Sequence, residues 1–241
     1  MIKHIFLLFL LMFSSAFSYI NIYPTEFNKK VDGQGGLIEY NLYNRTDKNV
    51  RYHISLLDSK TDSMASWGEI YPKTLTLKPS EEKTIKLLIK APKGTKEGEY
   101  SAVLNIKEME VPSLEKVKSK NTSVTILTNF SMEILGYVGA INPNLEITDF
   151  GLKKSKKSLE FSGVMENTGK RSGRYNMFLT DSKGNNRYFL GDFTILKNES
   201  IQLSDFNQNI KDEKTLKLLP KLNWIFIVDK DNEKVTNKLS I

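Results

Sequence analysis

The side chains that could carry out chemistry in this chain are few and widely separated. The 241-residue sequence contains no cysteine and only two histidines, His4 and His53. Thiol catalysis, cysteine-ligated zinc and iron–sulfur clusters are therefore excluded, and two histidines cannot form a multi-histidine metal site. His53 falls between Tyr52 and Ile54 in an alternating pattern, which predicts a solvent-facing position on a strand.

Sequence motifs of known catalytic sites are also missing. The chain has no Gly-x-Ser-x-Gly elbow, no P-loop and no His-Glu-x-x-His motif. The glycine-rich stretch 33–36 lacks the following helix that a phosphate cradle requires, so it predicts a turn. The acidic pair at 81–82 lies in a lysine-rich turn, which gives no reason for a raised carboxyl pKa. We therefore expect a non-enzymatic protein with no cofactor and no metal site.

The charge of the chain is modestly basic, with 35 Lys and Arg against 28 Asp and Glu. The basic residues are spread out among acidic ones, which favours solubility and argues against a nucleic-acid partner. The lysine-rich run 153–157 could suggest a polyanion site, but the pattern around it favours a solvated hairpin tip.

The N-terminus has the pattern of a secretory signal peptide. A basic start is followed by the apolar run 5–13 and by small residues at Ala16 and Ser18. We expect residues 1–18 to be a signal peptide that is cleaved before Tyr19. A membrane anchor is the alternative, but the run is shorter than the roughly 20 residues that span a bilayer. No other apolar run of that length follows, so the mature chain is expected to be exported without membrane insertion.

The rest of the chain shows strand signals about every ten residues and no sustained helical period. In the first half, the expected strands are 20–23, 37–43, 50–57, 74–77, 84–90, 100–106 and 124–134. Seven short strands in about 115 residues are typical of an immunoglobulin-like sandwich.

A break in the pattern at 139–144 indicates a linker or the entry to a second domain. The strands expected beyond it are 145–150, 159–165, 174–180, 187–194, 200–206, 224–228 and 233–239. The fold class is therefore predicted as all-β, with two immunoglobulin-like β-sandwich domains in tandem, at 19–136 and 137–241.

The strand expected at 124–134 is unusual in its length and pattern. Its alternating apolar positions are Val124, Ile126, Thr128, Phe130, Met132 and Ile134. At about 3.3 Å per residue it would extend roughly 36 Å, twice the usual strand length. The stretch before it, 108–120, is long and polar. A long apolar strand with an unpaired edge is normally blunted, so its retention suggests a partner. A core strand that crosses from one domain to the next is the alternative.

With these features in place, the sequence resembles the PapD-like periplasmic chaperones of chaperone–usher pilus assembly. The resemblance is carried by the signal peptide, the mature length, the alternating strand at 124–134, and the passage Ile-Tyr-Pro-Lys-Thr-Leu-Thr-Leu-Lys-Pro-Ser-Glu-Glu-Lys-Thr-Ile at 70–85. In that passage Pro72 and Pro79 match the family pattern, and Ser80 stands where the family has glycine. The resemblance covers residues 19–135, whereas 140–241 match only in length and strand content.

The resemblance implies a periplasmic protein that lends its seventh strand to a pilus or fimbrial subunit and passes the subunit to an outer-membrane usher. The expected subunit-binding residues are Val124, Ile126, Thr128, Phe130 and Met132. Among them the resemblance makes Val124, Ile126 and Thr128 the donor positions. It places Phe130 and Met132, together with Ile134, toward the protein's own core.

In the family, an arginine near the first strand and a lysine on the seventh hold the subunit's carboxylate. Here the first strand, 19–25, has no basic residue, and Glu133 aligns with the lysine. The carboxylate anchor is therefore unknown, with Lys29, Lys30 and Lys120 as open candidates. The alternative function, from another class, is a secreted or surface immunoglobulin-like binding or adhesion module with no folding role.

Overall fold

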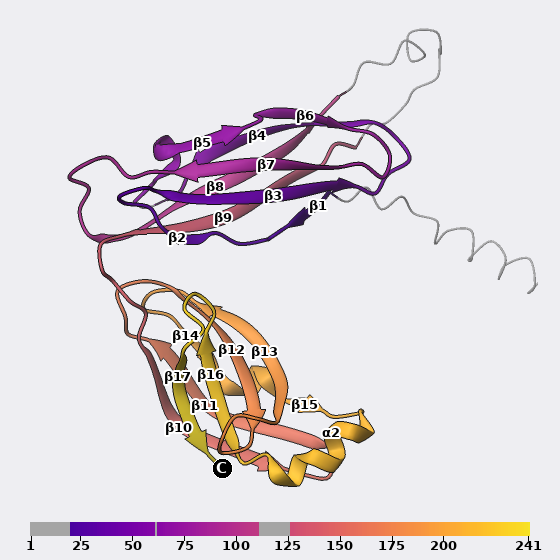
Figure 1. The fold of residues 1–241 in the computed structure, drawn as a ribbon, viewed down its shortest axis with the longest axis vertical. Helices are drawn as coiled ribbons and strands as arrows, with labels where there is room; N and C mark the ends of the chain where they lie inside the picture. Colours follow the sequence, from indigo (N-terminus) through magenta and orange to yellow (C-terminus); the bar gives the residue numbers. More distant parts are fainter. Residues whose placement is uncertain (1–19, 61, 111–125) are drawn as a thin grey trace, which may run out of the picture. The chain divides into compact units, whose positions relative to one another are not determined.

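The computed structural model describes residues 20–60, 62–110 and 126–241 and divides the chain into two compact units (Figure 1). The first unit comprises the described residues up to Thr95 together with Tyr100–Val138, and the second comprises Lys96–Glu99 and Gly139–Ile241. Each unit contains two β-sheets, so the expected all-β fold of two sandwiches is confirmed. The predicted signal peptide at 1–18, with its cleavage before Tyr19, lies outside the described residues.

The first unit is built from strands β1 to β9. One sheet, the β1 sheet, has the order β1-β3-β7-β5, and the other, the β9 sheet, has the order β2-β9-β8-β4-β6. The bounds are β1 (Ile20–Tyr23), β2 (Asn28–Lys30), β3 (Gly36–Asn44), β4 (Val50–Asp58), β5 (Gly68–Tyr71), β6 (Thr74–Leu77), β7 (Glu82–Ile89), β8 (Gly98–Met109) and β9 (Asn129–Val138), with the short 3₁₀ helix η1 (Ala65–Trp67) before β5.

The core of this unit is formed by alternate side chains that face inward from the two sheets. Tyr40 and Leu42 of β3 and Ile134 of β9 are among its fully buried members. Burying one large aliphatic or aromatic side chain contributes about 1.5–3 kcal/mol. Burial also raises the pKa of the Tyr40 hydroxyl, and the charge of Glu26 adds to the shift. The core therefore depends on the period-two pattern that the sequence shows.

The prediction of one strand over 124–134 was wrong in its bounds. The strand β9 begins at Asn129 and ends at Val138, residues 126–128 are described but are not in a strand, and Val124 lies outside the described residues. The strand continues through Gly136 because β2 pairs with it there. A Cβ atom at Gly136 would lie 2.7 Å from the Met64 sulfur, so glycine permits close packing at this position rather than ending the strand.

Two turns predicted from the sequence are confirmed. Residues 31–35 connect β2 to β3 and contain the turn. Gly35 has a φ of 83°, and a Cβ atom added there would lie 2.7 Å from the Ile89 carbonyl oxygen, so the position requires glycine. The lysine-rich run ends in the turn 155–157 between β10 and β11, where Lys156 and Lys157 are exposed.

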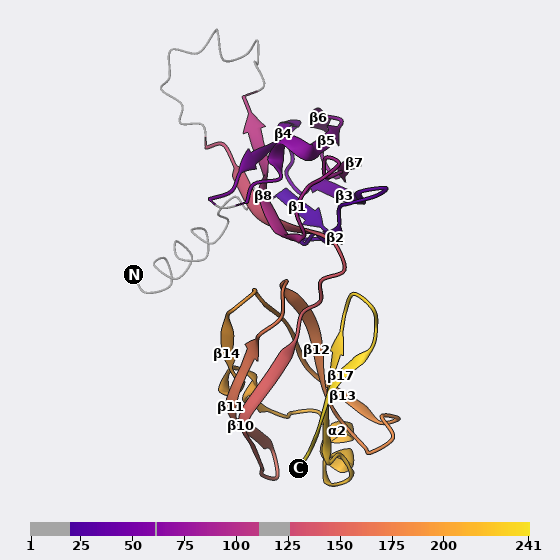
Figure 2. The same cartoon turned by 90° about the vertical axis from the view of Figure 1, so that its left-hand side faces the viewer.

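The second unit also has two sheets (Figure 2). The β11 sheet has the order β10-β11-β14, with β15 pairing with β11, and the β12 sheet has the order β13-β12-β16-β17. The bounds are β10 (Leu145–Lys154), β11 (Ser158–Asn167), β12 (Gly173–Thr180), β13 (Arg187–Ile195), β14 (Ser200–Gln202), η3 (Leu203–Phe206), β15 (Gln208–Asn209), α2 (Glu213–Leu218), η4 (Leu219–Lys221), β16 (Trp224–Asp229) and β17 (Val235–Ser240).

The helix α2 is an element that the sequence pattern did not predict. Its N-cap is Asp212, whose carboxylate accepts hydrogen bonds from the Thr215 backbone N–H at 2.7 Å and from its hydroxyl at 2.6 Å. These bonds lower the pKa of Asp212. Six residues are too few to show a helical period, so only the capping pattern signalled this helix. Within the described ranges, no helix is long and apolar enough to cross a membrane.

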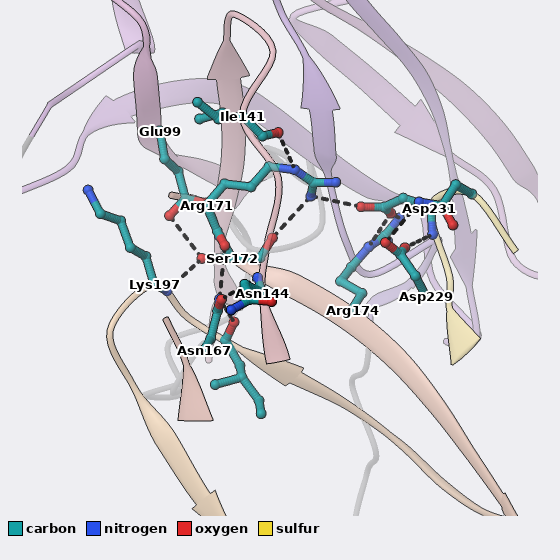
Figure 3. A network of polar contacts seen from close by, with 12 residues as sticks. Glu99, Ile141, Asn144, Asn167, Arg171, Ser172, Arg174, Lys197, Asp229 and Asp231 are labelled. Carbon is teal, nitrogen blue, oxygen red and sulfur yellow. Dashed lines mark hydrogen bonds and ion pairs between the residues drawn. The ribbon is translucent and has the colours of Figure 1, made fainter. Parts of the chain in front are cut away.

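A buried arginine organises one end of the second unit (Figure 3). Arg171, 3% exposed, donates to the carbonyl of Ile141 at 3.2 Å, to the carbonyl of Ser172 at 3.1 Å and to the Asp231 carboxylate at 3.0 Å. Arg174 donates to the other oxygen of Asp231. The guanidinium thus joins the segment that precedes β10 to the start of β12 and to the β16–β17 turn.

Replacing Arg171 with alanine should destabilise the second unit selectively. The change leaves buried carbonyls without a donor and Asp231 with one cation, so we expect a loss near the lower end of the roughly 3–5 kcal/mol typical of a broken buried ion pair. The two tryptophans, Trp67 and Trp224, lie in different units. Urea unfolding in a Trp67→Phe background therefore reports on the second unit through Trp224. A change below about 1 kcal/mol would contradict the assigned role.

Candidate functional site

The strand β9 has one edge that is only partly paired. Its first edge lies against β8, and its second edge pairs with β2 in parallel, with Asn28 opposite Leu135 and Lys30 opposite Tyr137. A further bond runs from the Leu135 N–H to the Phe27 carbonyl at 2.9 Å. Before Leu135, none of the described strands pairs with this second edge. We call residues 129–134 along this edge the open edge.

The direction of the β2 ladder shows which backbone groups the open edge presents. Leu135 points its N–H toward β2, and successive residues of a strand point their backbone groups to opposite sides. The N–H and C=O groups of Asn129, Ser131 and Glu133 therefore face the open edge. The bond from the Glu108 N–H to the Thr128 carbonyl, 2.8 Å, fits this alternation, because it places Thr128 toward β8.

The open edge exists because the chain before β2 changes sheets. Since β2 runs parallel to β9, a continuation of β2 toward the N-terminus in the same sheet would run back along the open edge. However, β1 pairs with β3 through Ile20 opposite Asn44 and Tyr23 opposite Asn41, which places it in the other sheet (Figure 1). The strand that could have covered residues 129–134 is therefore used elsewhere.

The side chains at alternate positions of this segment become more buried along the chain. Ile126, before the strand, is 84% exposed, Phe130 and Met132 are half-buried and pack against the core, and Ile134 is fully buried. Thr128 is half-buried. Four of the five residues predicted to bind a subunit are therefore described, with Phe130 and Met132 on β9 and Ile126 and Thr128 just before it, and Val124 lies outside the described residues. Their role in binding stays a prediction.

The outward side of the same segment is polar and is fixed by a residue that sequence reasoning missed. Asn105 of β8, 8% exposed, donates its amide hydrogens to Asn129 Oδ1 at 2.8 Å and to Ser131 Oγ at 2.9 Å. The Phe130 carbonyl lies 3.4 Å from the same nitrogen. One buried amide therefore holds two of the three outward side chains of the open edge, Asn129 and Ser131, next to β8.

A second side chain of β8 holds the start of the segment. The Glu108 carboxylate accepts a hydrogen bond from the Thr128 N–H at 3.0 Å, while its backbone bonds to the Thr128 carbonyl. Together with Asn105, this contact holds the start of the segment in an extended conformation against β8. The only sequence signal was a polar Asn105 between the apolar Leu104 and Ile106.

The candidate carboxylate anchors lie beside the paired part of β9. Lys29 stands opposite Gly136 in the β2 ladder, and Lys30 makes an exposed ion pair with Asp32 at 3.5 Å. Both are therefore located where the open edge ends. Glu133 is exposed on the outward face, and Lys120 lies outside the described residues. The anchor stays open.

The chemistry available at the site is backbone hydrogen bonding and apolar burial. Tyr52 stands opposite Glu108 in the β4–β8 ladder. Burial raises the pKa of the Tyr52 hydroxyl to about 12, and the charge of Glu108 adds to the shift. The phenol is therefore neutral at physiological pH. His53 is exposed, as predicted, with its Nδ1 3.4 Å from Thr74 Oγ1. In the part of the chain that the structure describes, no group of three His, Asp or Glu side chains could hold a metal ion.

Comparison with known proteins finds no matching family model and no curated relative. Solved structures do resemble the chain. The SafA pilin in complex with the SafB chaperone from Salmonella enterica matches with 9% identity and a TM-score of 0.48, over 95% of this chain and 98% of the other. The E. coli chaperone DraB matches with 8% identity, a TM-score of 0.47 and coverage of 92% and 97%. The CsuC–CsuE complex of a chaperone and a tip adhesion subunit from Acinetobacter baumannii matches with 15% identity, a TM-score of 0.42 and coverage of 92% and 98%.

Replacing Asn105 with leucine should loosen the open edge without unfolding the unit. Losing the amide bonds to β9 removes about 1–1.5 kcal/mol of local stability. Hydrogen exchange at the Phe130 and Met132 amides, which face β8, should therefore accelerate about fivefold to tenfold. Asn41→Leu is the matched control, because Asn41 also makes a cross-strand side-chain bond, to Thr84 at 2.8 Å, in the other sheet. Equal exchange rates in the two variants would show that Asn105 does not order the edge.

Proposed function

We propose that this chain is an exported, periplasmic chaperone that binds fimbrial or pilus subunits by donating β9, and that passes them to an outer-membrane usher without performing catalysis. The observation that carries the proposal is the open edge of β9, where backbone groups and half-buried apolar side chains are left available on one strand. SafB and CsuC are chaperones found with a pilin and a tip subunit, respectively.

An open, apolar edge is a hazard for a protein that has no partner. Unpaired strand edges promote aggregation, and proteins usually protect them with charges, prolines or short strands. Among the residues of the open edge, only Glu133 carries a charge, and its outward position leaves the apolar face intact. A partner strand that pairs with the edge would satisfy the N–H and C=O groups of Asn129, Ser131 and Glu133.

The side chains would provide the larger part of the binding free energy. A buried aliphatic side chain contributes about 1.5–3 kcal/mol, compared with about 0.5–1.5 kcal/mol for one backbone hydrogen bond. Ile126 is the most exposed apolar side chain of the described part of the segment, and Phe130 and Met132 still have surface to bury. A subunit whose own sandwich lacks a strand offers a groove of complementary shape. The backbone ladder then fixes the register of the two chains.

Ile126→Arg is expected to abolish subunit binding while leaving the chaperone folded. At 84% exposure the side chain contributes little to the fold, but an arginine would be buried in the subunit groove without a partner. The measurement is co-purification of small exported β-sandwich proteins with the tagged chain from its native cell envelope. Leu37→Arg, at a 53% exposed leucine of the β1 sheet, is the control and should bind normally. Undiminished binding by Ile126→Arg would argue for an adhesion module that uses another surface.

Proline at Glu133 tests the backbone role of the open edge by itself. The Glu133 N–H faces the open edge, so proline leaves the β8 ladder intact and removes only the donor offered to a partner. Because the partner's acceptor is then left unsatisfied, at a cost of about 1–3 kcal/mol, affinity should fall at least about fivefold relative to Glu133→Ala. Isothermal titration with the purified subunit measures the difference. Equal affinities would mean that the partner does not pair with this edge.

A further inference from the structure

The solvent face of the β12 sheet, in the second unit, carries phenylalanines where polar side chains are expected. Met177 and Leu179 of β12 lie in the core, so Phe178 points to the other side of the sheet. Phe178 stands opposite Phe189 of β13 on one side and opposite Phe226 of β16 on the other. These three residues, the aromatic row, cross three adjacent strands. An antiparallel sheet that packs on a core by one face normally exposes a polar other face.

The aromatic row continues into apolar neighbours on the same face. Val228 and Val235 are paired across β16 and β17, and Val235 is 37% exposed. Trp224 is half-buried beside Phe226 on β16. Phe189, on the edge strand β13, is 50% exposed. The face therefore presents apolar surface to solvent at both ends of the row.

Two cations lie over the aromatic row. The Arg187 guanidinium carbon is 5.6 Å from the ring centre of Phe178, and Lys238 Nζ is 5.0 Å from the ring centre of Phe226. Among the described residues, neither cation forms an ion pair with a carboxylate. The nearby Asp192 is paired with Lys230 at 3.1 Å. The aromatic row thus carries positive charge that no side chain of the described part neutralises.

The other sheet of the same unit provides an internal comparison. The solvent face of the β11 sheet follows the usual rule, with exposed Glu146 and Thr148 on β10 and exposed Glu160, Ser162 and Glu166 on β11. The solvent faces of the β11 sheet and the β12 sheet belong to the same unit and have the same overall composition and solvent available to them. The apolar and cationic character of the β12 sheet is therefore a local feature and does not reflect the composition of the unit.

Cross-strand packing explains only part of the aromatic row. Aromatic pairs on adjacent strands stabilise a sheet, and this packing is a sufficient reason for a phenylalanine at 226, because only 4% of its surface is exposed. Phe189 is not, because half of its surface lies in solvent on an edge strand, although its ring is 5.6 Å from that of Phe178. A polar residue at 189 would protect the edge better.

We propose that the aromatic row, with Arg187 and Lys238, is a docking surface for an acidic segment of a partner protein. Carboxylates of the partner would pair with the two cations, and an apolar side chain of the partner would cover Phe189. Exposed aromatic residues and arginine are the side chains that dominate protein interfaces, and unneutralised charge selects partners of the opposite sign. The surface lies on a different unit from the open edge and shares no residue with it.

The test uses two capped 12-residue peptides: three repeats of Glu-Leu-Glu-Ser, and the same sequence with lysine in place of glutamate. Each is titrated into the mature full-length protein at low ionic strength and followed by amide chemical shifts. The acidic peptide should bind and shift resonances of β12, β13, β16 and β17, and the basic peptide should not bind. Raising the salt to 150 mM should weaken the acidic complex several-fold.

Two variants make the result decisive. The double change Arg187→Glu with Lys238→Glu should reverse the preference between the two peptides, so that the basic peptide binds and the acidic peptide does not. Phe189→Ser should weaken binding of the acidic peptide about tenfold or more, and its half-exposed position allows the unit to fold. The matched control is Lys156→Glu with Lys157→Glu, which reverses the same number of charges in the turn of the other sheet.

The control variant should bind the acidic peptide as the unmodified protein does. Equal binding of the two peptides, absence of binding, shifts confined to other strands, or the same loss in the control variant would each overturn the proposal. Failure of the Ile126→Arg test would leave it untouched, since the two surfaces share no residue.

Discussion

The open edge of β9 depends on a single constraint, which is that the N-terminal chain serves both sheets of the first sandwich. It pairs with β3 through β1 and with β9 through β2, and the change of sheet falls between Tyr23 and Asn28. A chain of fixed length cannot cover the whole of β9 while it also completes the β1 sheet. The backbone groups of Asn129, Ser131 and Glu133 are left available as a direct consequence of this division.

An available edge is useful only if it keeps its shape. The Asn105 amide and the Glu108 carboxylate provide this by fixing β9 against β8 from outside the core, while Ile134 anchors the strand inside it. Phe130 and Met132 lie between these anchors and are only half-buried. The backbone of the segment is therefore held on its β8 side while its packing is incomplete, which is the combination that the proposed strand addition requires.

Period-two alternation was sufficient to predict two β-sandwiches and to place Phe130, Met132 and Ile134 on the core side of β9, because alternation directly reflects burial. It could not place the start of β9 at Asn129, since the first residues of an edge strand are defined by their neighbour on β8. It also missed β2 and β5, which are short and are specified by pairing rather than by composition. The role of Asn105 was invisible for the same reason, because its partners lie 24 and 26 residues away.

The two units expose opposite kinds of surface, and the difference indicates different kinds of recognition. The open edge offers backbone groups, which any extended chain can satisfy, so it favours a broad class of partners with suitable apolar side chains. The aromatic row offers side chains and unneutralised charge, which discriminate by sequence and by sign. If both surfaces are used, the first unit selects a partner by its extended backbone and apolar side chains, and the second selects a partner by its negative charge. Because they lie on separate units, each could change in evolution without disturbing the core of the other.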